Sequence, residues 1–217
     1  MDNNEYKIPQ LTAPQQRVLG VLIEKSRTTP EVYPLSLTSL TLGCNQKSAR
    51  NPVVNYDEEL VIATLNQLKI MALTSTATGG SSRVTKYKHN MGIVFPLVPA
   101  DLSILCLLFL RGPLTAGEIN SNSGRLFEFD SIEEVSEHLE NLAESEHPFV
   151  KKLAKKPGQK EGRYIHLFGD SEIEIEESSI EQVENQSSNN ADLEARVAVL
   201  ELELTELKEM VNLLMNG

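Results

Sequence analysis

Residues 44–53 form a polar segment whose residue types and spacing suggest a binding chemistry. Lys47 and Arg50 lie three residues apart among amide and hydroxyl side chains, in the run Cys44-Asn45-Gln46-Lys47-Ser48. Cationic groups beside such donors are typical of sites that hold an anion or a phosphate group. The segment is therefore a candidate anion-binding loop.

A second interpretation uses the same segment inside the fold. Asn45 and Gln46 would satisfy the polar ends of neighbouring helices, and Arg50 would pair with Asp57 or Glu58. From the sequence alone, the two interpretations carry equal weight.

Two further groups of cations surround loops that contain glycine and lie between predicted strands. Such side chains can contact backbone phosphates, which positions a protein on a nucleic acid without selecting a base sequence. Lysine also protects exposed strand edges, so an ordinary hairpin surface is the competing interpretation. With the polar segment included, the candidate nucleic-acid-binding residues are Lys47, Arg50, Arg83, Lys86, Lys88, Lys155, Lys156, Lys160 and Arg163.

Residues typical of catalysis or metal binding lack the necessary spacing. His89, His138, His147 and His166 form no metal-binding pattern such as H-E-x-x-H. Two cysteines are too few for a disulfide framework or a zinc site. Cys44 is expected to be a small buried residue rather than a reactive thiol. We expect no enzyme activity, no catalytic residue, no metal and no cofactor.

The elements that must hold the cations occur twice in the same order: helix, strand, loop, strand. A tyrosine lies in the second strand of each copy. This order predicts an α+β protein with two winged-helix domains in tandem. The repeated apolar positions are Val61, Leu65 and Leu68 in the first copy and Val135, Leu139 and Leu142 in the second.

Apolar periodicity and capping residues give approximate bounds for these elements. Helices are predicted at about 13–26, 37–43, 58–71, 102–110, 116–121 and 132–145. Strands are predicted near 72–76, 83–89, 149–153 and 163–168. The predicted N-cap residues are Thr12, Ser36, Asp57 (or Asn55) and Ser131, with capping boxes completed by Gln15 and Glu134.

The net charge of −11 is distributed unevenly along the chain. Residues 1–100 carry ten Lys and Arg against seven Asp and Glu, a net +3, whereas residues 101–170 carry eight against twelve. Only the first domain would attract phosphates by its own net charge. The helix at 132–145 has five glutamates and no cation, so we do not expect it to read a DNA groove.

The remaining 47 residues carry two cations against twelve carboxylates. We predict domains at 1–95 and 96–169, a disordered acidic linker at 170–191 and a coiled coil at 192–217. Leucine at every d position and valine at two a positions favour a parallel homodimer. A single helix packing on its own body is the alternative. The predicted dimerisation residues are Leu193, Val197, Leu200, Leu204, Leu207, Val211 and Leu214.

Targeting signals are not evident in the sequence. There is no run of about 18 apolar residues that would form a transmembrane helix. The segment Met1-Asp2-Asn3-Asn4-Glu5 lacks the basic-then-apolar order of a secretory signal. We therefore expect a cytoplasmic protein with no membrane partner.

Several motifs resemble the YceH-like family of bacterial proteins. They are Tyr33-Pro34-Leu35 and the segments 44–53, 83–87, 110–113, 117–118 and 163–168. The resemblance covers roughly residues 11–217 and implies tandem winged-helix domains, with no established activity. Asn120 and Asn122 depart from the basic residues expected in that family, and Asn51 departs from the usual acidic one. The first departure weakens the case for DNA binding by the second domain.

Two functions follow as hypotheses. The first is a DNA-binding, transcription-regulatory protein with a helix-turn-helix fold, which contacts the duplex through its basic hairpins and the 44–53 segment. The second is an interaction scaffold that binds another protein and makes no direct contact with DNA. The basic loops favour the first hypothesis, and the acidity of residues 101–217 favours the second.

Overall fold

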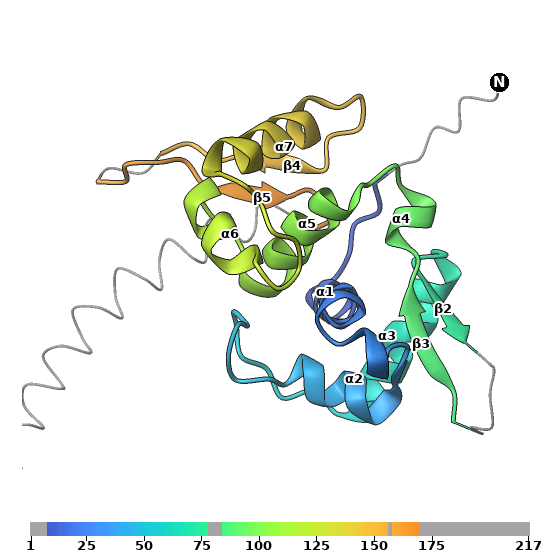
Figure 1. The fold of residues 1–217 in the computed structure, drawn as a ribbon. Helices are drawn as coiled ribbons and strands as arrows, with labels where there is room; N and C mark the ends of the chain where they lie inside the picture. The colour runs from blue at the N-terminus through green and yellow to red at the C-terminus, as the bar shows by residue number, and fades with distance from the viewer. Residues whose placement is uncertain (1–7, 78–83, 156–157, 170–217) are drawn as a thin grey trace, which may run out of the picture. The chain divides into compact units, whose positions relative to one another are not determined.

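The computed structural model describes residues 8–77, 84–155 and 158–169 (Figure 1). These residues form seven α-helices, one short 3₁₀ helix and five strands in two antiparallel sheets. The predicted α+β class is therefore confirmed. The predicted linker and coiled coil lie outside the described residues. Within the described ranges, no helix combines the length and apolarity needed to cross a membrane.

The first half of the described chain runs helix, strand, helix, helix and hairpin. Strand β3 lies between β1 and β2 and is antiparallel to both. The elements are α1 (Ala13–Thr28), the 3₁₀ helix (Pro30–Val32), β1 (Leu35–Ser36), α2 (Leu37–Cys44), α3 (Glu58–Ile70), β2 (Thr74–Ala77) and β3 (Lys86–His89). Helix α4 (Met91–Val94) follows in the connection to the second half.

The second half repeats the three helices and the hairpin, as predicted, whereas β1 and its counterpart were not predicted. An isolated antiparallel bridge between Leu114 and Tyr164 takes the place that β1 has in the first half. The elements are α5 (Pro99–Arg111), α6 (Ala116–Ser123), α7 (Ile132–Glu144), β4 (Val150–Lys152) and β5 (Tyr164–His166). Strands β4 and β5 pair antiparallel. We call β2 with β3 the first hairpin, and β4 with β5 the second hairpin.

The repeated apolar triplets are buried in both copies. Each of the six side chains is at most 5% exposed, and all six belong to one hydrophobic cluster. Complete burial of a valine or leucine side chain contributes about 1.5–3 kcal/mol. The spacing seen in the sequence therefore reflects two equivalent core-facing helices, α3 and α7.

The predicted N-caps begin their helices with the expected hydrogen bonds. The Thr12 N–H donates to Gln15 Oε1 at 2.8 Å. The predicted capping box at Ser131 is only half correct, because the Glu134 carboxylate accepts the Asp130 N–H at 2.7 Å instead of reaching the cap residue. Side-chain oxygens accept a backbone N–H three residues on, at 2.8–3.2 Å, in Ser36, Asp57 and Ser131.

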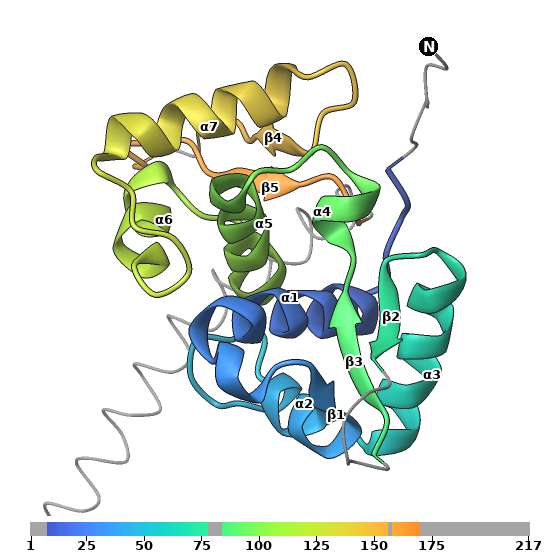
Figure 2. The ribbon, with the colours of Figure 1, turned by 45° about the vertical axis from the view of Figure 1, so that its right-hand side comes forward.

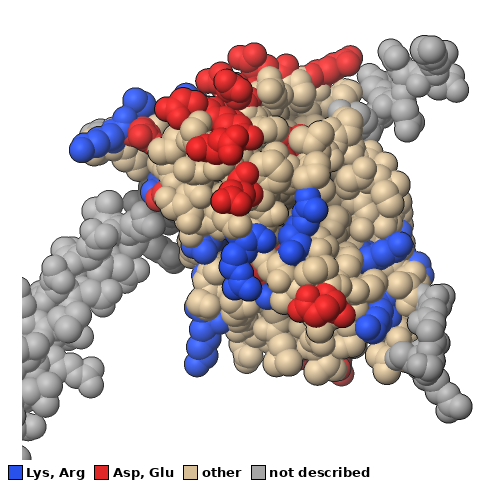
Figure 3. Space-filling model, in the orientation of Figure 1, with Lys and Arg blue, Asp and Glu red and all other residues tan. Residues whose placement is uncertain are grey.

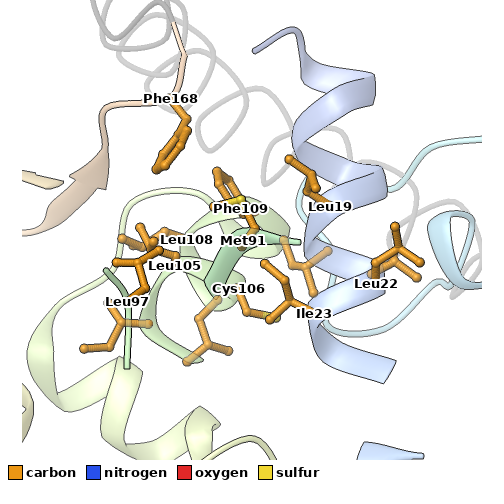
Figure 4. Packing of buried hydrophobic residues seen from close by; sticks show 14 of the residues in the cluster. Leu19, Leu22, Ile23, Met91, Leu97, Leu105, Cys106, Leu108, Phe109 and Phe168 are labelled. Atoms are coloured by element: carbon orange, nitrogen blue, oxygen red, sulfur yellow. The ribbon is translucent and has the colours of Figure 1, made fainter. Parts of the chain in front are cut away.

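Helices α1 and α5 pack closely and join the two halves into one body (Figures 2 and 4). The Cys106 thiol donates to the Gly20 carbonyl at 3.4 Å. In Figure 4, Leu19 and Ile23 of α1 point toward α5, where Phe109 lies. The boundary predicted between residues 95 and 96 thus falls in a connection whose two sides share one core.

Replacing Gly20 with valine should destabilise the protein. A Cβ at this position would lie 2.8 Å from Leu110 Cδ2 and 3.1 Å from Phe109 Cβ. Overpacking a filled core typically costs about 1–3 kcal/mol, which urea unfolding followed by circular dichroism would measure.

Gly117→Ala is the matched control, because a Cβ there would meet only Thr115 Oγ1, at 3.9 Å. Its stability should stay unchanged or rise slightly, since alanine favours the helix over glycine by about 1 kcal/mol. If Gly20→Val unfolds at the same urea concentration as the natural chain, α1 and α5 do not pack as described.

Candidate nucleic-acid interface

The polar segment 44–53 begins at Cys44, the last residue of α2, and continues into the loop before α3. Asn45 Nδ2 donates to the Tyr56 carbonyl at 2.7 Å, and the Tyr56 N–H donates to Asn45 Oδ1 at 2.7 Å. The Gln46 amide donates to the Ser48 carbonyl at 3.3 Å. Asn45 and Gln46 were expected to satisfy helix ends, but Asn45 ties the two ends of the loop together and Gln46 bonds within it.

Arg50 is committed to the interior of the fold. Its side chain is 0% exposed and forms two bonds to Glu24 of α1, from Nη1 to Oε1 at 3.0 Å and from Nη2 to Oε2 at 2.7 Å. The Gly43 carbonyl accepts from Arg50 Nε at 3.2 Å and from Nη2 at 3.1 Å. The predicted pairing with Asp57 or Glu58 is therefore wrong.

Glu24 is ionised because of this pairing. Burial disfavours its charged form, but the hydrogen bonds and positive charge of Arg50 outweigh burial and hold the pKa of Glu24 below its ordinary value. Of the two cations in the polar segment, only Lys47 has an exposed side chain.

The first hairpin presents two cations on one side of its sheet. Lys86 and Lys88 alternate with Tyr87 and His89 along β3, so the two lysines share the other face of the sheet. Lys88 lies opposite Ser75 of β2. Within the described residues, neither lysine forms an ion pair, and their cross-strand neighbours are uncharged: Ser36, Ser75 and Ala77.

A third cation lies close to this strand. Burial lowers the pKa of the His89 imidazole, and the nearby charge of Arg27, exposed in the last turn of α1, lowers it further. The Ser26 hydroxyl bonds His89 Nε2 at 3.2 Å and thereby ties this end of α1 to the end of β3. Arg27 therefore lies close to the His89 end of β3, the strand that also carries Lys86 and Lys88.

The second hairpin carries cations of two different kinds. Lys155 and Lys160 are exposed at the surface, and Lys155 Nζ donates to the Lys160 carbonyl at 3.1 Å. Arg163 instead bonds the Glu118 carboxylate at 2.8 and 2.9 Å and the Pro113 carbonyl at 2.7 Å. Arg163 therefore ties the start of β5 to the start of α6.

Other predicted site residues lie outside the described part of the chain. They are Arg83, Lys156 and the dimerisation residues Leu193, Val197, Leu200, Leu204, Leu207, Val211 and Leu214.

The candidate cations do not gather in one place. The two hairpins lie on different sides of the α1–α5 pair in both ribbon views (Figures 1 and 2). In Figure 3, acidic side chains crowd the part of the surface near α7, while cationic side chains form separate groups elsewhere. The two hairpins therefore present separate surfaces.

The two repeated helices expose different chemistry. The exposed side chains of α3 beyond its first turn are mostly uncharged, including Asn66 and Gln67, with Lys69 as their only cation. Those of α7 are mainly glutamates: Glu133, Glu137, Glu140 and Glu144. Repulsion by phosphates makes α7 a poor partner for DNA.

Arg17 and Glu24 were not identified from the sequence, although both lie under the 45–57 loop. Arg17 is 3% exposed, and its Nη2 donates to the Pro52 carbonyl. The sequence did contain one signal, because the charged residue Arg17 comes directly before the apolar run that begins at Val18. A cation buried at such a position needs hydrogen-bond partners inside the protein. The carbonyl that accepts from Arg17 belongs to Pro52, 35 residues along the chain, so no local sequence pattern predicts this hydrogen bond.

Burial shifts the pKa of several titratable side chains in the interior. Burial raises the pKa of the Cys44 thiol to about 12, so the thiol stays protonated, as its expected buried role implies. His89 and His166 end β3 and β5, and burial lowers the pKa of each to about 4. The described residues include no group of three His, Cys, Asp or Glu side chains placed to hold a metal ion.

Known proteins are similar to this sequence over nearly its whole length. The family model described as "Protein of unknown function, DUF480" matches residues 11–159. The chain belongs to the DUF480/UPF0502 family of uncharacterised bacterial proteins. This assignment agrees with the resemblance to the YceH-like family noted above.

Individual UPF0502 proteins align with almost no unmatched sequence. One from Shewanella piezotolerans is 46% identical over 213 residues, which covers 95% of this chain and 98% of the relative. Another from Shewanella pealeana is 44% identical over 215 residues, or 96% and 100% of the two chains. A relative from Aliivibrio fischeri is 42% identical over 208 residues, or 92% and 95%.

This UPF0502 protein should lose stability in mild acid because His89 and His166 are buried in the neutral form. In the unfolded chain an imidazole takes up its proton near pH 6.5, whereas in the folded chain it does so only near pH 4. Between these values the unfolded state binds more protons, so the free energy of unfolding falls as pH drops from about 6.5 to about 4. The loss should be on the order of a few kcal/mol, measured by urea unfolding across this range.

The double variant His89→Gln and His166→Gln should flatten that pH dependence, whatever its effect on stability at neutral pH. If the variant and the natural chain lose the same free energy between pH 6.5 and 4, titration of carboxylates is responsible instead.

Proposed function

We propose that this UPF0502 protein is a tandem winged-helix protein that binds nucleic acid through its first hairpin. The order helix, strand, helix, helix and hairpin, present twice, supports the winged-helix assignment. In helix-turn-helix proteins the second helix of the motif approaches the DNA, and adjoining segments contact the backbone. The corresponding helices here are α3 and α7.

The observation that carries the proposal is the pair Lys86 and Lys88 on one face of β3. Their uncharged cross-strand neighbours and lack of ion pairs within the described residues leave both charges available to phosphates. Arg27 adds a third positive charge near the same strand. Neutralisation of phosphates, with release of bound counterions, supplies most of the affinity of non-specific DNA binding.

The internal bonds of Arg50 and Arg163 narrow the proposed contact set. Lys47, in the loop before α3, remains in the set because its side chain is exposed. Lys155 and Lys160 are left out of the set, since the second hairpin lies on another side of the body (Figure 1). Contacts of this kind position a protein on the backbone and select little sequence.

Self-association and location complete the proposal. The heptad residues from Leu193 to Leu214 would form a homodimer, and linking two modest binding surfaces raises the overall affinity. A cytoplasmic protein with access to DNA, possessing no catalytic role, fits this function.

A second candidate function is an interaction scaffold. The exposed glutamates of α7, spaced three or four residues apart from Glu133 to Glu144, form a negative row along the helix. Such a row complements a positively charged protein and repels nucleic acid. In this function the second half of the described chain binds the partner protein.

Replacing Lys86 and Lys88 with methionine should weaken DNA binding and its dependence on salt. Each lost phosphate contact lowers the slope of log affinity against log salt by about 1, so the slope should fall by about 2. Fluorescence anisotropy of the full-length protein on labelled random duplex DNA, from about 50 to 200 mM salt, measures both quantities.

Lys155→Met with Lys160→Met is the matched control, since it removes the same charge from the second hairpin. Equal losses in the two double variants would show that the first hairpin has no special role. Absence of binding by the natural chain at the lowest salt would contradict the nucleic-acid proposal altogether.

For the scaffold function, changing Glu133, Glu137, Glu140 and Glu144 to glutamine should abolish co-purification of a basic protein partner. Removing four charges eliminates the electrostatic attraction while leaving the buried side of α7 intact. Affinity purification of the tagged full-length protein, followed by mass spectrometry, compares this variant with Glu58→Gln and Glu59→Gln in α3. Partners retained by the α7 variant would exclude α7 as their binding surface.

A further inference from the structure

The side of α3 that faces away from the core carries four exposed side chains. Val61, Leu65 and Leu68 are buried, so residues on the opposite side of the helix, spaced by four, three and four positions, point away from the body. Ile70 among them is 87% exposed, which means that it adds little to the core. We call this set the outer stripe of α3: Glu59, Ala63, Asn66 and Ile70.

The equivalent positions of α7 all carry glutamate. Because Val61, Leu65 and Leu68 correspond to Val135, Leu139 and Leu142, the outer stripe of α3 corresponds to four exposed residues of α7. They are Glu133, Glu137, Glu140 and Glu144. Four carboxylates in a row repel phosphates, whereas the outer stripe of α3 has only one, in the first turn, where it also stabilises the helix dipole. Of the two repeated helices, only α3 therefore suits close approach to DNA.

The side chains of the outer stripe of α3 complement base edges in the major groove. An asparagine amide pairs with adenine through N6 and N7, a glutamate accepts from cytosine N4, and apolar side chains contact the thymine methyl group. The neighbouring amide of Gln67 serves the fold instead, because its Oε1 accepts from Gln15 Nε2 of α1 at 2.9 Å. Asn66 is thus the amide of α3 that faces outward.

We propose that the outer stripe of α3 reads base sequence in the major groove, with Asn66 selecting adenine. This inference rests on the proposed nucleic-acid function and adds sequence choice to the backbone contacts of Lys86 and Lys88. The second helix of a helix-turn-helix motif enters the major groove, whose width of about 12 Å admits an α-helix. In that position Glu59 accepts from the N4 amino group of a cytosine.

The helical spacing fixes how far apart these contacts lie. A helix advances about 1.5 Å per residue, so Glu59 and Asn66 are about 10 Å apart along the axis of α3. Base pairs follow one another at about 3.4 Å along a strand. The selected cytosine should therefore lie about three base pairs from the selected adenine, with thymine methyl groups beside Ala63 or Ile70.

Selection of bound duplexes from a randomised pool by the full-length protein tests this inference. Sequencing of the selected duplexes should reveal one position at which adenine is preferred. Fluorescence anisotropy then compares the selected duplex with one in which that A·T pair is replaced by G·C. The natural chain should prefer the selected duplex by about 5- to 150-fold, the discrimination that one bidentate base contact provides. Asn66→Ala should bind the two duplexes equally.

Lys69→Met is the matched control, because it removes a cation from the exposed surface of the same helix. Loss of a phosphate contact weakens binding to both duplexes by a similar factor and leaves their ratio unchanged. If Asn66→Ala keeps the natural preference for adenine, the inference is wrong. Selected duplexes with no shared sequence would also refute it while leaving backbone binding intact. Absence of any binding at low salt would instead refute the proposed function together with this inference.

Discussion

The close packing of α1 against α5 is the contact on which the rest of the fold depends. Gly20 has no side chain, so α5 approaches near enough for the Cys106 thiol to reach the Gly20 carbonyl at 3.4 Å. Separating the two halves would expose the cluster shown in Figure 4, at a cost proportional to its apolar area. The hairpins are consequently held on different sides of one body, and the protein presents two separate surfaces.

Burial removes part of the positive charge of the first half from the protein surface. Its sequence is mildly basic, yet Arg17 and Arg50 lie in the interior and Glu24 is bound to one of them. These two cations are bound to the 45–57 loop and α1 inside the fold, so they cannot contact a phosphate at the surface. The cations of the first half that remain accessible to a ligand are fewer than the composition suggests, and they include Lys47, Lys86 and Lys88.

Structural features that depend on residues close together in the chain could be predicted from the sequence. Contacts between residues far apart in the chain could not. The caps at Ser36 and Asp57 act within three residues, and the Val61-Leu65-Leu68 triplet repeats along one helix, so local spacing was sufficient for both. Strand β1 has two residues and pairs with Tyr87 and Lys86, far along the chain, which leaves no local pattern. Arg50 shows the same limit: nearby Asp57 and Glu58 are plausible partners by distance along the chain, but the fold brings Glu24 to it.

The repeat preserves the core and not the surface. Apolar positions on α3 and α7 are equivalent because each must fill the same space beneath a hairpin, and deleting a buried methylene there leaves a cavity. No such constraint acts on the exposed sides, where α3 is largely uncharged and α7 carries four glutamates. Two copies of one scaffold can therefore serve different ligands. The cationic strand β3 and the acidic helix α7 belong to different copies, so a nucleic acid and a basic protein would not compete for the same surface.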